Sequence, residues 1–166
     1  MGIPVYFKTL IDDYDTICKQ SLDKQIDYLF FDLNCLIHPC CRGLTDELLM
    51  YQEIVDKIQY IIDKVNPIQS YIAIDGPCPR QKIHQQRMRR FKSSKEKKEW
   101  DTNAITPGTK FMEQLEIYIQ EHLYSYKYIL DSSNNPGEGE HKIVSYIKEQ
   151  KIQTPSIIYG LDADLI

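Results

Sequence analysis

The chain has 166 residues, of which 42% are hydrophobic, so it fits one domain with a core of ordinary size. Its net charge is −4, and it contains neither a run of about 18 apolar residues nor a signal-peptide pattern, which argues against a membrane or secreted protein. Five cysteines without a C-x-x-C pair favour reduced thiols over a disulfide scaffold or a structural zinc site. We therefore expect an intracellular protein without a membrane partner, in the cytoplasm more than in the nucleus.

Four short apolar runs predict strands, and helical patterns lie between them. The strands are expected at Tyr28 to Leu33, Tyr71 to Ile74, Lys127 to Leu130 and Ser156 to Leu161. Strands that alternate with helices need crossover connections, and such connections produce a parallel sheet covered on both faces. The sequence therefore predicts an α/β fold with a mainly parallel central sheet flanked by helices.

Three helices of this fold can be placed by their caps and by their apolar period. Thr45 is expected to cap a helix that lays an apolar stripe, from Leu48 to Val65, on the sheet. A second helix is predicted to open at Thr106-Pro107, since proline is favoured in a first turn. A shorter helix is expected from about Glu138 to Gln150.

Acidic residues follow the predicted strands. Three predicted strands lead into the aspartates Asp32, Asp75 and Asp162. Because the carboxyl ends of parallel strands converge on one edge of a sheet, these side chains should meet. Asp164 lies two residues beyond Asp162, and such positions point the same way in an extended chain. The sequence therefore predicts a cluster of aspartates at the carboxyl ends of the strands, which we call the acidic edge of the sheet.

The segment after the third strand adds Glu138 and Glu140, with glycines at 137 and 139 that allow turn conformations. Carboxylates on one edge repel one another unless cations bind between them. Oxygen ligands of this kind suit Mg²⁺ or Mn²⁺, and two such ions can clamp the attacking and leaving oxygens of a phosphodiester. A cap or turn role remains the alternative for a single acid. The predicted metal site comprises Asp32, Asp75, Glu138, Glu140, Asp162 and Asp164.

The positive charge is concentrated in one segment. Between Arg80 and Lys98 there are nine basic residues and one acid, whereas the rest of the chain has 11 basic and 23 acidic residues. The segment predicts a helix that is polar almost all round. One face of it would gather side chains able to bind a phosphate dianion, namely Lys82, Gln86, Arg89 and Arg90. A generic helix for a nucleic acid or a membrane surface is the alternative. His38 is a candidate for stacking on a base, or a structural histidine.

Six segments in this order resemble the characteristic blocks of the Xrn-type 5′→3′ exoribonucleases. They are MGIPVYF, FDLNCLIH, AIDGPCPRQKIHQQRMRRF, ITPGTKFM, NPGEGEHKI and GLDADLI. The resemblance spans nearly the whole chain, so residues 1–166 would form the N-terminal part of a larger catalytic region. It implies processive hydrolysis of single-stranded RNA with a 5′-monophosphate to mononucleotides, with divalent ions held by the six acids.

The resemblance also assigns the phosphate and base contacts. It implies a 5′-phosphate pocket at Lys82, Gln86, Arg89 and Arg90, and base stacking by His38. It further implies a fold like that of the flap and PIN-like nucleases, with Gly2 near the site and with more acidic ligands, strands and a second stacking aromatic beyond Ile166. Cys35 departs from the family, which usually has glycine there.

Two alternatives stay open. A structure-specific 5′ nuclease acting on DNA flaps would carry a similar acidic site. A non-catalytic fragment would only bind 5′-phosphorylated RNA ends. No pattern in the sequence identifies a protein partner.

Overall fold

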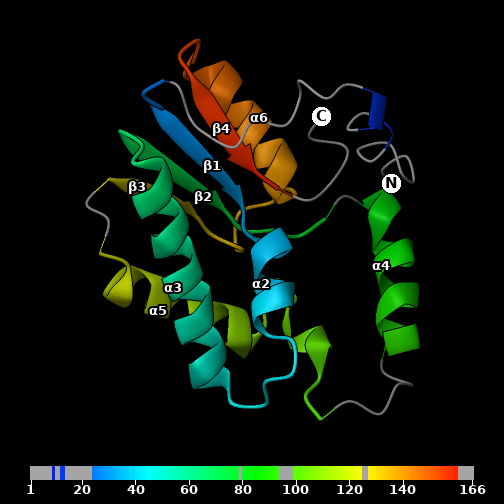
Figure 1. The fold of residues 1–166 in the computed structure, drawn as a ribbon. Helices are drawn as coiled ribbons and strands as arrows, with labels where there is room; N and C mark the ends of the chain where they lie inside the picture. Colours follow the sequence, from blue (N-terminus) through cyan, green and yellow to red (C-terminus); the bar gives the residue numbers. More distant parts are fainter. Residues whose placement is uncertain are drawn as a thin grey trace.

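A computed structural model describes residues 9, 12–13, 24–78, 80–93, 99–124 and 127–160, without the side chains at 80, 81, 85, 89 and 93. Strands and helices alternate along the chain, as predicted (Figure 1). In chain order they are β1 (Tyr28–Asp32), α2 (Asn34–Cys40), α3 (Glu47–Val65), β2 (Gln69–Ala73), α4 (Arg80–Ser93), the 3₁₀-helix η1 (Thr102–Ala104), α5 (Lys110–His122), β3 (Tyr128–Asp131), α6 (Gly139–Glu149) and β4 (Ser156–Tyr159).

The four strands form one parallel sheet in the order β3-β2-β1-β4. Asp32 at the end of β1 lies opposite Ala73 of β2, which in turn lies opposite Asp131 of β3. The carboxyl ends of these strands therefore meet at one edge, where parallel sheets bind their ligands. The predicted α/β fold with a parallel central sheet is confirmed.

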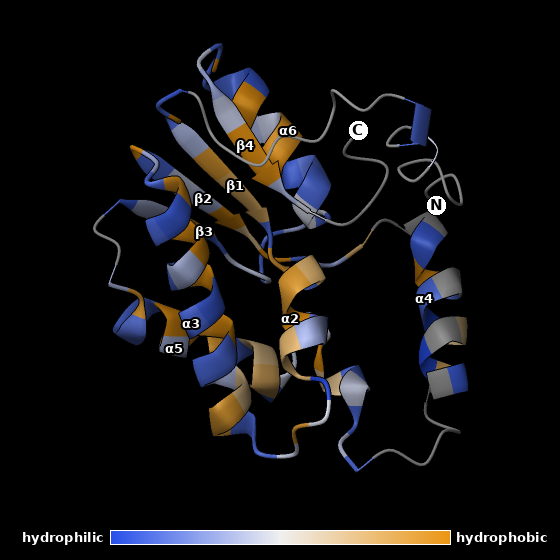
Figure 2. Cartoon of the chain, viewed as in Figure 1, coloured by the Kyte–Doolittle hydropathy of each residue, from blue (hydrophilic) through white to orange (hydrophobic). Residues whose placement is uncertain are grey.

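The core lies on both faces of the sheet. Leu29 and Phe31 of β1 pack in the larger cluster with α2, α3 and α5, whereas Phe30 packs on the other face with Tyr71 and with Ile143 of α6. Successive side chains of a strand point to opposite faces, so a strand covered on both sides must be apolar throughout. Figure 2 shows hydrophobic residues in the middle of β1 and at the carboxyl end of β2, whereas hydrophilic residues dominate the described part of α4.

The start of α3 differs from the prediction. Asp46 caps the helix instead of Thr45, because the Asp46 carboxylate accepts a hydrogen bond from the Leu48 N–H at 2.8 Å. Leu48 and Leu49 were expected on the buried stripe and are instead 59% and 48% exposed. The first buried residue of the helix is Met50, one position further along.

The start of α5 was also predicted at the wrong residue. The helix begins at Lys110, and Thr106 and Pro107 belong to the turn before it. Its cap is Thr109, whose hydroxyl accepts from the N–H of Met112 at 3.4 Å and donates to the Thr106 carbonyl at 2.8 Å. The predicted limits of α6, by contrast, are correct to one residue at each end.

Several predicted positions lie outside the described residues. They are Gly2, Leu161 at the end of the predicted fourth strand, the acids Asp162 and Asp164, and the side chain of Arg89. Two observed elements, α2 and η1, were not predicted. Among the helices that the structure describes, none combines the length and the apolar character needed to cross a membrane.

Two loops at the carboxyl edge of the sheet are held against each other. The Gly76 N–H donates to the Gly137 carbonyl at 2.8 Å, and the Gly137 N–H donates to the Pro77 carbonyl at 3.2 Å. A Cβ on Gly76 would lie 1.7 Å from the Asn135 carbonyl oxygen. Only glycine permits this approach, so the loop after β2 is fixed to the loop after β3.

We expect Gly76→Ala to lower the free energy of unfolding by about 3 kcal/mol or more, because the new methyl group would displace a backbone carbonyl. Gly43→Ala is the matched control. Gly43 has a φ of +80° and open space around its Cα, so it should lose only about 1 kcal/mol. Urea unfolding measures both, and equal losses in the two variants would contradict the close packing at Gly76.

Candidate functional site

Asp32 and Asp75 approach the same residue of helix α6. Oδ1 of Asp75 accepts a hydrogen bond from the Gly139 N–H at 2.7 Å. A Cβ on Gly139 would lie 2.7 Å from Oδ1 of Asp32, and Asp32 is only 7% exposed. The first turn of α6 therefore meets the ends of β1 and β2 at Gly139, and the lack of a side chain there lets both carboxylates approach this residue.

Two glutamates flank Gly139. One carboxylate oxygen each of Glu138 and Glu140 and a ring nitrogen of His141 lie within 4.8 Å of one another. The glutamate side chains are 15% and 18% exposed, so both are partly withdrawn from water. The structure thus brings four of the six predicted acids to one edge of the sheet. His141 was not singled out from the sequence, although it lies within a segment that was.

The electrostatics of this edge reflect crowded negative charge. Burial raises the pKa of Asp75 above its ordinary value, and the nearby carboxylate of Glu138 raises it further, while the Gly139 N–H opposes the shift. Glu138 itself is compensated by Lys82, whose Nζ lies 2.6 Å from Oε2 of Glu138. Asp32 accepts a hydrogen bond from the Cys35 thiol at 3.2 Å, so the residue that departs from the family pattern contacts a predicted ligand.

The donor set fits a hard divalent cation. Carboxylate oxygens from three segments surround Gly139, where any larger residue would collide with Asp32. Mg²⁺ and Mn²⁺ prefer such oxygen ligands, and a bound cation would relieve the repulsion that raises the pKa of Asp75. These acids are therefore the residues of the described chain best placed to hold the predicted metal.

A pocket of about 270 Å³ adjoins the acids. It is lined by Asn34, His38, Asp75, Gly76, Gln86, Arg90, Thr102, Asn103, Ile105, Thr106 and Pro107. Within it, Nη2 of Arg90 donates to Oε1 of Gln86 at 3.2 Å, and the same oxygen accepts from the Cys78 thiol at 3.2 Å. Residues that the sequence assigned to a metal site, a phosphate face and a base contact therefore line a single pocket.

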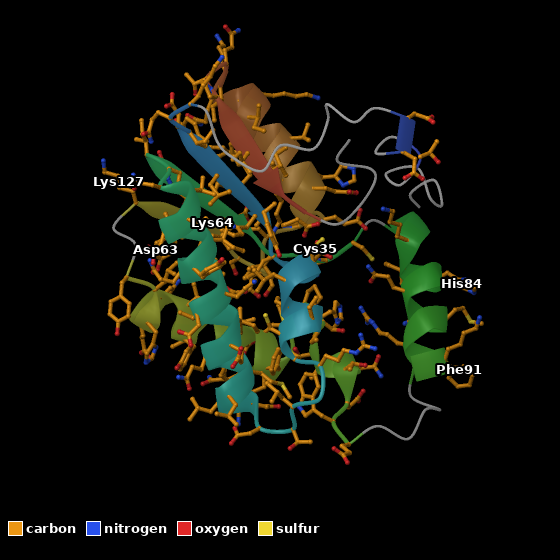
Figure 3. All side chains as sticks on the ribbon, in the orientation of Figure 1. Cys35, Asp63, Lys64, His84, Phe91 and Lys127 are labelled. Atoms are coloured by element: carbon orange, nitrogen blue, oxygen red, sulfur yellow. The ribbon has the colours of Figure 1, made fainter. Side chains whose placement is uncertain are left out.

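Helix α4 presents one face to this site. Lys82 lies one turn before Gln86, and its ion pair with Glu138 links the basic face to the acidic edge. Figure 3 shows His84 and Phe91 projecting from the side of α4 that faces away from α2. The two faces of α4 therefore differ, as the helical spacing of Lys82, Gln86 and Arg90 predicts.

Two charged residues at the same edge were missed. Asp131 ends β3, and Lys142 of α6 lies 3.2 Å from it, with its side chain only 5% exposed. The run YILD ends in an aspartate as YLFFD does, so a signal for Asp131 was present in the sequence. Nothing in the sequence distinguished Lys142 from the exposed lysines.

The chain matches the protein family described as "XRN 5'-3' exonuclease N-terminus" over residues 1–99 and 92–166. It is 34% identical to 5'-3' exoribonuclease 1 of Schizosaccharomyces pombe, in a match that covers all of this chain and 16% of that protein. It is 33% identical to 5'-3' exoribonuclease 2 of Gallus gallus, covering all of this chain and 25% of that protein. The chain thus spans between about a sixth and a quarter of the length of these relatives.

A solved structure shares the fold. It is described as the T5 D15 protein co-crystallized with metal ions, and the match has a TM-score of 0.56 at 11% identity. The match covers 84% of this chain and 49% of that chain. At this identity the likeness concerns the fold alone, and it confirms the expected PIN-like, 5′-nuclease-like architecture.

Replacing Asp75 by Asn should stabilise the chain at pH 7 in the absence of divalent ions. A carboxyl whose pKa is raised by folding favours the folded state only while protonated, and this contribution is lost as pH rises through the raised pKa. An amide keeps the acceptor for the Gly139 N–H and removes the buried charge. Urea unfolding in EDTA should therefore show a higher midpoint for Asp75→Asn at pH 7 than for the wild type.

The gain should shrink as the pH falls toward 3.5, where the wild-type carboxyl becomes protonated. Asp63→Asn, at an exposed position on α3, is the control and should show no comparable gain. A lower urea midpoint for Asp75→Asn than for the wild type at pH 7 would contradict the conclusion that the buried charge of Asp75 destabilises the folded chain.

Proposed function

The chain belongs to the XRN 5'-3' exonuclease family, whose N-terminal region it matches, and on this premise we propose that it forms the N-terminal catalytic part of a 5′→3′ exoribonuclease. Its proposed substrate is single-stranded RNA with a 5′-monophosphate, which it would hydrolyse to mononucleotides. The observation that carries the proposal is the meeting of four carboxylates around Gly139 beside a pocket lined by Gln86 and Arg90.

The acids are proposed to hold the catalytic metal. Asp32, Asp75, Glu138 and Glu140 would bind Mg²⁺ or Mn²⁺, and Asp162 and Asp164 would complete the ligand set. When bound, such ions supply an activated water and stabilise the leaving oxygen of the phosphodiester. The partial burial of the carboxylates supports this role, because weakly solvated carboxylates gain more from a bound cation than exposed ones do.

The basic face of α4 is proposed to bind the 5′-phosphate. Arg90 and Gln86 line the pocket, and Lys82 and Arg89 would complete the set of donors. Asp75 lines the same pocket, so a phosphate beside Arg90 places the first scissile bond close to the acids. His38 also lines the pocket, and its proposed role is to stack on the first base.

Discrimination between RNA ends follows from this arrangement. A site fitted to one phosphate would reject the additional phosphates of a 5′-triphosphate and would bind a 5′-hydroxyl weakly. A reducing intracellular location belongs to the same proposal, since Cys40, Cys41 and Cys78 form no disulfide within the described chain.

We expect the chain with Mg²⁺ to release mononucleotides from 5′-monophosphate RNA, and to act poorly on matched RNAs with a 5′-triphosphate or 5′-hydroxyl. Arg90→Ala should lower the rate on 5′-monophosphate RNA at least about tenfold, because hydrogen bonds to a charged group contribute about 1.5–3 kcal/mol. Arg87→Ala is the matched control, since this exposed arginine of α4 does not line the pocket. It should keep the preference for the monophosphate.

Five results would contradict or redirect the proposal. Full monophosphate preference in Arg90→Ala would contradict the phosphate pocket. Magnesium-dependent cleavage that survives in Asp32→Ala, or any cleavage by the wild type that persists in EDTA, would contradict the metal site. Monophosphate-selective binding without cleavage would favour a module that only binds RNA ends, and selective cutting of DNA flaps would favour the flap nuclease.

A further inference from the structure

A buried lysine lies directly behind the acidic edge. The ammonium group of Lys142 donates to the Ile74 carbonyl at 2.7 Å and to the Ser132 carbonyl at 2.8 Å, and it lies 3.2 Å from Oδ1 of Asp131. An ammonium has three N–H donors, so these three partners use all of them. A lysine that is 5% exposed costs stability unless its charge and its donors are satisfied, and here both are.

These contacts join the segments that carry the proposed metal ligands. Ile74 immediately precedes Asp75, and Ser132 follows the end of β3. Lys142 itself belongs to α6, where its backbone N–H donates to the Glu138 carbonyl at 3.0 Å. One ammonium group therefore ties the end of β2 and the end of β3 to the helical turn that begins at Glu138.

Asp131 provides a fixed anionic partner for this lysine. Its carboxylate also accepts hydrogen bonds from the Tyr71 hydroxyl and from Nδ2 of Asn135. Although burial raises the pKa of Asp131, these bonds and the Lys142 contact hold it below its ordinary value. Asp131 is therefore ionised at neutral pH, and it is held in place from three directions.

We propose that Lys142 is a positioning residue for the acidic edge. It fixes Asp75 and the first turn of α6 relative to each other, and so sets the spacing of the carboxylates that flank Gly139. This inference rests on the proposed metal site. Lys142 supplies no ligand and does not line the phosphate pocket, so it acts through the residues that it anchors.

A simpler role for Lys142 would be that of a counter-charge, and the two roles predict opposite effects on metal binding. A fixed ammonium near the carboxylates repels an incoming divalent cation, so its loss would tighten metal binding if charge alone mattered. Loss of a positioning residue instead displaces the ligands, which typically weakens metal binding by about 10- to 100-fold. The sign of the change therefore separates the roles.

The test measures Mn²⁺ binding to the whole chain, with free Mn²⁺ followed by electron paramagnetic resonance. Lys142→Met keeps the length of the side chain and removes the ammonium, and we expect it to raise the Kd for Mn²⁺ at least about tenfold. Asp131→Asn leaves both carbonyl contacts of Lys142 in place and should raise the Kd less than Lys142→Met does. Lys148→Met, at an exposed position on α6, is the matched control and should bind as the wild type does.

Unchanged or tighter Mn²⁺ binding by folded Lys142→Met would overturn the positioning role. If that variant does not fold, Lys142→Arg decides, because a guanidinium keeps the charge but cannot reproduce the three ammonium contacts. Weaker Mn²⁺ binding by Lys142→Arg supports positioning, and wild-type binding overturns it. The Mn²⁺-binding assay contains no RNA, so it tests this inference separately from the nuclease function. A wild-type chain that binds Mn²⁺ but cuts no RNA in the nuclease assay would count against the nuclease function and not against this inference.

Discussion

The close approach of helix α6 to the ends of β1 and β2 at Gly139 is the contact on which the candidate site depends. It places Asp32 and Asp75 against the same glycine, where a side chain would collide with Asp32. The cost appears as the raised pKa of Asp75, since burial and like charge both oppose ionisation. Lys142 of α6 offsets part of this cost by lowering the pKa of Asp75, and Lys82 of α4 pairs with the neighbouring Glu138. Such a locally unfavourable arrangement is typical of functional sites.

The architecture explains why cation-binding and anion-binding groups lie so close together. A parallel sheet directs its strand ends to one edge, and the loop that leaves β2 carries Asp75 to the acids before it enters α4. The pocket beside Asp75 is lined by Gln86 and Arg90 of that helix. The uneven distribution of charge along the sequence therefore becomes, in space, a basic face next to an acidic edge. In the proposed function, a phosphate and a divalent cation would be bound on either side of Asp75.

Much of this could be predicted from local patterns, and the misses have physical reasons. Apolar runs that end in aspartate fix the strands and, through the parallel topology, the acidic edge. Thr45 and Asp46 are both good caps, and the sequence does not show which one turns its side chain to the helix. Asp131 directly follows the third predicted strand, but the Ser, Asn and Gly residues after it are typical of a loop, so it was not included among the predicted ligands. The contact of Lys142 with Ile74 spans 68 positions, and no local pattern reports it.

The most direct measurement is anomalous diffraction from crystals of the chain grown with Mn²⁺. The account predicts an anomalous peak beside Gly139, within coordination distance of carboxylate oxygens of Asp32 and Asp75 and of at least one flanking glutamate. It also predicts that the peak disappears in Asp75→Asn. An anomalous peak found only at another place, or no peak at the acidic edge at millimolar Mn²⁺ with the fold intact, would contradict the claim that the contact at Gly139 builds a metal site.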